Sequence, residues 1–95
     1  MQVNRRESVI ERKCILIAKA RNWMEVKLER CNKNGMPDRM LMKNGRLIFI
    51  EFKNDKGALS EIQKHRHEEL RNHGMRVYVV RSEILMEAVL DENEL

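Results

Sequence analysis

The sequence predicts a single α/β domain over residues 1–95, in which helices flank a small mixed sheet. Apolar residues recur first at helical spacing, then at strand spacing over three short segments, and then in the order helix, strand, helix. Between the second and third strand segments lies Asn44-Gly45, and this dipeptide between apolar runs is a strong hairpin signal. A chain of 95 residues suffices for one domain and not for two. The expected order is therefore α-β-β-β-α-β-α.

The first third of the chain predicts a helix and an edge strand. Residues 7–22 carry apolar side chains every three or four positions, which is typical of an amphipathic helix. Residues 23–30 alternate apolar and charged side chains, so we expect a half-exposed strand there. A turn rich in Asn, Lys and Gly follows at residues 32–35. Pro37 has no amide hydrogen and suits the first residue of the next strand.

The predicted hairpin brings two acids together. If Asn44-Gly45 forms its loop, counting back along both strands places Asp38 opposite Glu51. Opposed residues have Cβ atoms about 4.5–5.5 Å apart, so we expect the two carboxylates to lie side by side. Lys53 shares the face of Glu51, because side chains two positions apart in a strand point to the same side.

The strand that ends with these residues is apolar on both faces, so we expect helices to cover both. Ser60, followed three positions later by Gln63, matches a capping box and starts a helix that runs to about His73. This helix has few apolar anchors and many basic residues, which favours a solvated or DNA-facing surface. His65 and His67 are two positions apart and point to different sides, so we do not expect them to share a metal ion.

The last segments complete the domain. Gly74 fits the end of the preceding helix, residues 75–81 form a Val-rich strand, and Ser82 can cap a final helix. Because the final helix is apolar around much of its girth, we expect it to be the most buried of the helices, against a second copy of the chain. The acidic end, residues 91–95, is expected to fray.

The net charge of +4 is unevenly distributed. Residues 83–95 hold five acids and no Lys or Arg, which leaves residues 1–82 with +9. A basic region suits a polyanion such as nucleic acid. A lysine-rich surface on an ordinary soluble domain explains the charge equally well, so charge alone leaves both interpretations open.

Cysteine spacing and hydropathy exclude two other classes of protein. Cys14 and Cys31 fit no zinc-binding spacing and are expected to be reduced thiols. No apolar run approaches the roughly 20 residues of a membrane span, and the N-terminus does not resemble a signal peptide. We therefore expect a cytoplasmic protein.

The two adjacent acids need a counterion. Mg²⁺ is a hard cation that takes one or two carboxylates and keeps several waters, so it can also hold a phosphate. A lysine beside such an ion can orient the attacking water and offset the charge that builds up on the phosphoryl oxygens. The pattern therefore favours phosphodiester chemistry.

Pro37-Asp38, followed by Glu51-Phe52-Lys53 at the end of an apolar strand, resembles the signature of the PD-(D/E)XK nuclease superfamily. A longer ordered set resembles the virus-type replication-repair nuclease (VRR-NUC) domain from about residue 7 to residue 90. The set comprises Gly35-Met36-Pro37-Asp38-Arg39, Ile50-Glu51-Phe52-Lys53, Leu59-Ser60-x-x-Gln63 and Gly74-x-x-Val77-Tyr78-Val79-Val80. The predicted order of elements agrees with the fold of that superfamily.

The resemblance implies roles for the residues around the hairpin. Asp38 and Glu51 would bind Mg²⁺ or Mn²⁺, the backbone carbonyl of Phe52 would add a ligand, and Lys53 would position or activate water.

The resemblance also implies a glutamate of the first helix in the metal site. Ile10-Glu11-Arg12 best matches that position, so Glu11 is the preferred candidate and Glu7, on the same helix face, is the alternative. Ion pairs with nearby basic residues explain both acids without a metal. Gln63 would lie near the metal or the scissile phosphate, although the capping box alone also accounts for it.

The implied function is a metal-dependent DNA endonuclease. A two-fold homodimer would present paired sites to a symmetric four-way (Holliday) junction, the preferred substrate, with flap or fork DNA as the next choice. The family name and the small size indicate a bacterial or phage origin and a part in DNA repair or recombination, and no small-molecule cofactor is expected. Two other functions stay open: a non-catalytic basic module that binds nucleic acid and retains the nuclease fold, and a small interaction protein dimerised by its last helix.

Overall fold

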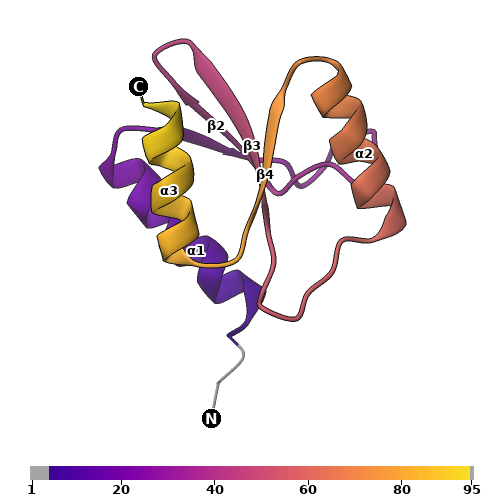
Figure 1. Ribbon diagram of the computed structural model, residues 1–95, viewed down its shortest axis with the longest axis horizontal. Helices are drawn as coiled ribbons and strands as arrows, with labels where there is room; N and C mark the ends of the chain where they lie inside the picture. Colours follow the sequence, from indigo (N-terminus) through magenta and orange to yellow (C-terminus); the bar gives the residue numbers. More distant parts are fainter. Residues whose placement is uncertain (1–4, 95) are drawn as a thin grey trace.

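The computed structural model describes residues 5–94 and confirms the predicted order of elements (Figure 1). The elements are α1 (Glu7–Ala20), β1 (Met24–Lys27), β2 (Arg39–Lys43), β3 (Arg46–Phe52), α2 (Glu61–Asn72), β4 (Arg76–Val80) and α3 (Glu83–Asn93). None of the helices within residues 5–94 has the length and apolarity needed to cross a membrane.

The four strands form one mixed sheet in the order β1-β2-β3-β4, with antiparallel pairs from β1 to β3 and a parallel pair between β3 and β4. The predicted hairpin is confirmed. Asn44 has a φ of 49° and Gly45 a φ of 80°, and positive φ at both loop residues matches a type I′ turn. This turn type suits the natural twist of the two strands and fixes their register, in which Arg39 pairs with Ile50.

Helices lie on both sides of the sheet. Figure 1 shows α1 and α3 together on one side and α2 on the other. The main core lies under α1 and α3, and it is built from alternate residues of the strands and the inner faces of these two helices. Its largest fully buried members are Ile10, Leu41, Ile48, Ile50, Phe52, Met86 and Leu90. On the other side α2 packs mainly against β4, so the expected cover of both faces is only partial, and Met24 of β1 is 57% exposed.

The edge strand is shorter than predicted. β1 ends at Lys27, whereas the alternating pattern continues to residue 30. Beyond β1 the amide of Leu28 donates to the carbonyl oxygen of Asp38 at 3.0 Å, and the chain then leaves the sheet. That bond ties the end of β1 to the residue that precedes β2.

The last helix is less buried than predicted. Met86 and Leu90 lie in the core, but Ile84 is 82% exposed and Leu85 is 44% exposed. α3 is therefore amphipathic within the single chain, because only one of its sides faces α1 and the sheet.

The acidic end was expected to fray, but α3 continues through Asp91 to Asn93. Two cationic side chains and an indole N–H donate hydrogen bonds to these acids and hold them in place. Arg21 pairs with Asp91 at 2.7 Å and with Glu94 at 2.5 Å, while Lys43 and the indole nitrogen of Trp23 donate to Glu94 at 2.7 and 2.6 Å. Hydrogen bonds from Lys43 and Arg21 lower the pKa of Glu94 to about 2. Leu95 lies outside the described residues.

The loop before β2 is fixed against α2. Gly35 has a φ of 80°, and a Cβ placed there would lie 2.5 Å from the carbonyl oxygen of Ile62. Next to it, Nε of Arg66 donates to the carbonyl oxygen of Asn34 at 2.9 Å. Both contacts come from α2, so this helix sets the path by which the chain reaches Asp38.

Gly35→Ala should therefore destabilise the protein more than the same change at Gly74. Gly74 has nearly the same φ, 84°, but an added Cβ there would have no atom within 4 Å. We expect Gly74→Ala to lose roughly 1–2 kcal/mol from the left-handed conformation, and Gly35→Ala to lose about 1–3 kcal/mol more from the clash. Urea unfolding of the two variants measures the difference. Equal losses would show that the loop moves away from α2 without resistance.

Candidate metal centre

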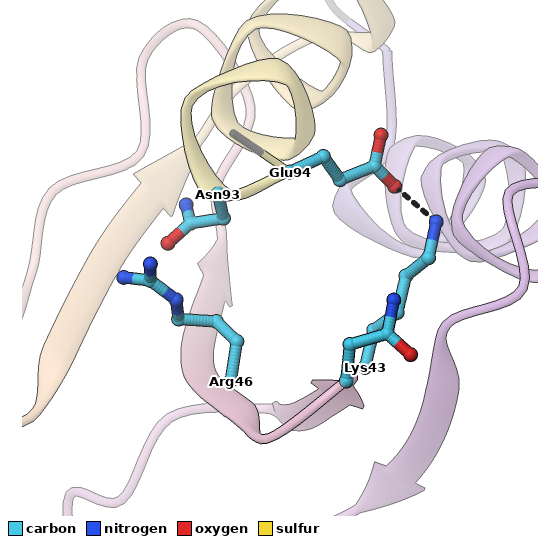
Figure 2. Close-up of a pocket in the computed structure, with 5 residues that line it drawn as sticks. Lys43, Arg46, Asn93 and Glu94 are labelled. Atoms are coloured by element: carbon cyan, nitrogen blue, oxygen red, sulfur yellow. Dashed lines mark hydrogen bonds and ion pairs between the residues drawn. The ribbon is translucent and has the colours of Figure 1, made fainter.

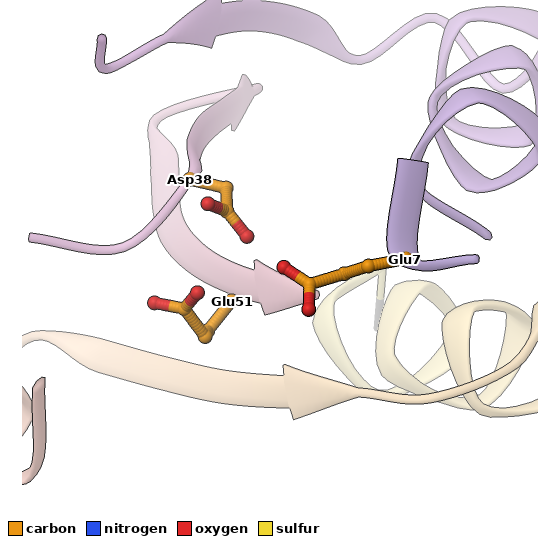
Figure 3. A group of neighbouring side chains, drawn as sticks. All are labelled: Glu7, Asp38 and Glu51. Carbon is orange, nitrogen blue, oxygen red and sulfur yellow. The ribbon is translucent and has the colours of Figure 1, made fainter. Parts of the chain in front are cut away.

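Three carboxylates converge at the end of the sheet opposite the hairpin turn. Glu7, Asp38 and Glu51 each offer an oxygen, and these oxygens lie within 4.8 Å of one another. Figure 3 shows that the side chains reach a common point from three elements: the first residue of α1, the residue before β2, and β3. Acids separated by more than forty positions in the chain therefore share one site.

The hairpin register explains the first two members. Arg39 pairs with Ile50, so the next positions along both strands are Asp38 and Glu51, and their predicted proximity is confirmed. Asp38 is fixed further by its own hydrogen bonds. Its Oδ2 accepts from the backbone amide of Phe52 at 2.7 Å, which orients the carboxyl group at the end of β3.

Glu51 is the most strongly perturbed acid of the cluster. Its side chain is 1% exposed. Burial, reinforced by the adjacent carboxyl of Asp38 and by Glu7, raises the pKa of Glu51 from its ordinary 4.5 to about 8, although Lys53 acts in the opposite direction. In the metal-free protein this carboxyl therefore holds a proton at neutral pH. A cation bound here would take the place of that proton.

The buried neighbour of Glu51 is a histidine that sequence reasoning placed elsewhere. Nε2 of His67 lies 3.2 Å from Oε1 of Glu51, and His67 is fully buried. Burial lowers the pKa of His67, and the charges of Arg71 and Lys53 lower it further, so the ring is neutral. The prediction that α2 turns its histidines towards solvent or DNA is wrong for this one. His67 is four positions after Gln63, so the two share a helix face, and this spacing was the feature of the sequence that could have placed His67 near the acids.

The structure separates the two candidate acids of α1. Oε2 of Glu11 accepts from Nε of Arg39 at 2.8 Å, and Arg39 also bonds to Glu25. Side chains alternate along β2, so Arg39 points to the opposite face from Asp38, and there it meets Glu11. The preferred candidate is thus held in an ion pair outside the cluster, while the alternative, Glu7, lies within it.

The other two predicted site residues, Lys53 and Gln63, come from the end of β3 and the start of α2. Lys53 directly follows β3, and its amide donates to the carbonyl oxygen of Val80 at 3.1 Å, which continues the pairing with β4. Gln63 forms the predicted capping box. Its backbone amide donates to Oγ of Ser60 at 3.2 Å, and its side-chain Oε1 accepts from the backbone amide of Ser60 at 3.0 Å. Gln63 is also one turn before His67, so both lie on the same side of α2.

A separate cavity of about 280 Å³ lies at the other end of β3, near the hairpin turn (Figure 2). It is lined by Lys43, Asn44, Arg46, Asn93 and Glu94. Figure 2 shows the ion pair between Lys43 and Glu94 at its rim. The Lys43–Glu94 pair is one of the contacts that hold the end of α3 against the hairpin, so part of this lining serves the fold.

Glu51→Gln should stabilise the metal-free protein at alkaline pH. The proton-linked stability of the wild type is complete below pH 4.5 and is lost as the pH rises to about 8, because the unfolded state releases the proton first. A glutamine does not ionise, so the thermal midpoint of the Glu51→Gln variant should stay level across this window. It should exceed the midpoint of the wild type at pH 8.5. Thermal unfolding in EDTA from pH 5 to 8.5 measures both, with Glu61→Gln, at an exposed position, as the control. Parallel curves for the wild type and Glu51→Gln would contradict the raised pKa.

Comparisons with known proteins agree with this geometry. A solved structure described as a VRR_NUC domain superimposes with a TM-score of 0.80 at 23% identity, covering 90% of this chain and 94% of that chain, which shows a shared fold. No curated protein matches the sequence. The model of the VRR-NUC domain family matches residues 4–84, a stretch that includes all three clustered acids, Lys53 and Gln63. The chain therefore belongs to the VRR-NUC family and is a nuclease-type domain.

Proposed function

We propose that this protein is a divalent-metal-dependent DNA endonuclease. The observation that carries the proposal is the convergence of Glu7, Asp38 and Glu51, of which Glu51 is almost completely buried and lies within the electrostatic influence of Lys53. Structural acids are usually paired with cations, whereas these three are crowded against one another. Such crowding is typical of sites that use a cation.

The donor set fits Mg²⁺ or Mn²⁺. Both prefer oxygen ligands, and the three acids supply only carboxylate oxygens, within 4.8 Å of one another. Ligands on opposite sides of one Mg²⁺ lie about 4 Å apart, so small movements of the side chains would suffice. Asp38, Glu51 and Glu7 are the proposed ligands.

The backbone carbonyl of Phe52 is a fourth proposed ligand. The Phe52 amide points to Asp38, with which it bonds at 2.7 Å. In a strand the N–H and C=O of one residue point to the same side, which supports a carbonyl directed to the Asp38 side of β3. That position is beyond the end of β2, where no strand partner competes for it.

Lys53, Asp38 and Gln63 have different proposed roles in hydrolysis. A bound cation would supply positive charge to the phosphate and lower the pKa of an attacking water. Lys53 places an ammonium near the buried Glu51, where it orients the water and offsets the charge that develops on the phosphoryl oxygens. Asp38 is held by its bond to the Phe52 amide and keeps one oxygen in place. Gln63, on the same side of α2 as His67, is proposed to contact the phosphate or a water beside it.

The proposed substrate is branched DNA, with a four-way junction as the first choice and a flap or fork as the second. The +9 charge of residues 1–82 supports a polyanionic substrate. A two-fold homodimer would present two sites to a symmetric junction, and the exposed Ile84 and Leu85 of α3 offer it an apolar contact. We place this activity in the cytoplasm of a bacterial or phage-infected cell, in line with the replication and repair in the family name.

Asp38→Asn should abolish cleavage and leave DNA affinity unchanged. The amide keeps the size of the side chain but removes the charge that holds the ion. Labelled four-way, flap and linear DNA, incubated with Mg²⁺, Mn²⁺ or EDTA, measure cleavage, and gel shifts in EDTA measure binding. Asp55→Asn, in the exposed loop after β3, is the matched control and should cut like the wild type. Binding without cleavage by the wild type in either metal would favour a non-catalytic module.

Glu7→Gln should reduce cleavage more than Glu11→Gln. Glu7 lies in the cluster, so its loss should raise the Mg²⁺ concentration needed for half-maximal cleavage. Glu11→Gln leaves Arg39 paired with Glu25 alone, so it should mainly lower the thermal midpoint. Magnesium titrations and melting curves of the two variants check the ranking. The reverse ranking would return Glu11 to the metal site.

A further inference from the structure

α2 buries a single residue completely, and that residue is polar. His67 is 0% exposed, whereas the helix's own apolar Ile62 is 44% exposed. An imidazole removed from water loses its hydrogen bonds to water, and this costs free energy unless bonds to the protein replace them. A packing role alone would be filled better by an aliphatic side chain, so the reason for a histidine must lie in the bond that it makes.

That bond goes to the cluster. Nε2 of His67 lies 3.2 Å from Oε1 of Glu51, while Nδ1, equally buried, has no partner among residues 5–94. All of the ring's hydrogen bonding within the described chain is therefore directed at one oxygen of one acid. A neutral imidazole has one donor and one acceptor nitrogen, and an ionised Glu51 can only accept. Once a bound cation has displaced the proton of Glu51, the arrangement fits a proton on Nε2 and a bare lone pair on Nδ1.

We propose that His67 is a positioning residue that holds Oε1 of Glu51 and so presents Oε2 to the bound cation. This inference rests on the proposed function of the cluster. Metal-binding carboxylates are commonly held by a second hydrogen-bonding group, which fixes their orientation before the ion arrives. Glutamate has three rotatable side-chain bonds, so a fixed Oε1 restricts the remaining freedom of Glu51 at the point where it binds.

α2 would then position both strand acids at once. Through His67 it holds Glu51, and through the bond from Arg66 to Asn34 and the close contact with Gly35 it holds the loop that delivers Asp38. The helix itself is fixed at its start by the capping box of Ser60 and Gln63. This makes α2 the element that keeps the two sides of the metal site at a constant spacing.

A matched pair of substitutions tests the hydrogen bond. Gln and Met are similar in length and unbranched at Cβ and Cγ, but only Gln has an amide that can replace Nε2. His67→Met should weaken Mn²⁺ binding by roughly tenfold or more, as is usual for the loss of such a partner, and His67→Gln should recover most of that affinity. Electron paramagnetic resonance of free Mn²⁺ measures binding without DNA, and thermal unfolding in EDTA checks that each variant is folded. His65→Gln, at an exposed position on the same helix, should bind like the wild type.

The outcomes separate the inference from the function on which it rests. If the wild type binds no Mn²⁺ and cuts no DNA, the proposed function fails and this inference fails with it. If the wild type binds Mn²⁺ and folded His67→Met binds equally well, only the role of His67 is overturned. Equal weakening by Met and Gln would also overturn it, because the hydrogen bond would then not be the cause.

A measurement on the wild type decides the matter if His67→Met does not fold. Nitrogen-15 spectra of the Mg²⁺-loaded protein distinguish the two neutral tautomers of histidine. The proton of His67 should be on Nε2, with Nδ1 bare. A proton on Nδ1 would leave Nε2 with nothing to donate to the ionised Glu51, and the inference would be withdrawn.

Discussion

The register between β2 and β3 is the constraint on which the site depends. The turn at Asn44-Gly45 fixes it at one end, and at the other end the next two positions are Asp38 and Glu51. A slip of one residue would turn one of the acids to the opposite face of the sheet. The bond from the Phe52 amide to Asp38 then fixes the last residue beyond the ladder. A two-residue turn thus controls a site at the far end of the strands.

The same register also creates an unfavourable electrostatic arrangement. Glu51 is buried beside two other acids, and its pKa of about 8 records how strongly the fold resists its ionisation. The apolar core under α1 and α3 supplies the stability that offsets it. The two faces of the sheet therefore have different tasks: one holds the domain together, and the other bears the charged groups at its end.

The features that could be predicted from the sequence are those that depend on residues close together in the chain. The hairpin follows from Asn44-Gly45 and the start of α2 from Ser60 and Gln63, because turns and caps are local. The choice between Glu7 and Glu11 was not local: it depends on where α1 crosses the end of the sheet and on Arg39, which pairs with Glu11. The burial of His67 likewise depends on a strand sixteen residues earlier. No periodic pattern distinguishes such a histidine from a solvated one.

The place where α1 begins also affects how the protein is best purified. Glu7 is both the first helical residue and a member of the acidic cluster, so the backbone at residues 5 and 6 leaves the domain beside the carboxylates. Glu94, which bonds to Lys43 next to the hairpin turn, lies at the far end of β3. Imidazoles of a polyhistidine sequence joined ahead of residue 5 would therefore start from the side of the proposed cation site and compete there for transition metals. The same sequence joined after Glu94 would start from the opposite end of the sheet, beside the hairpin turn.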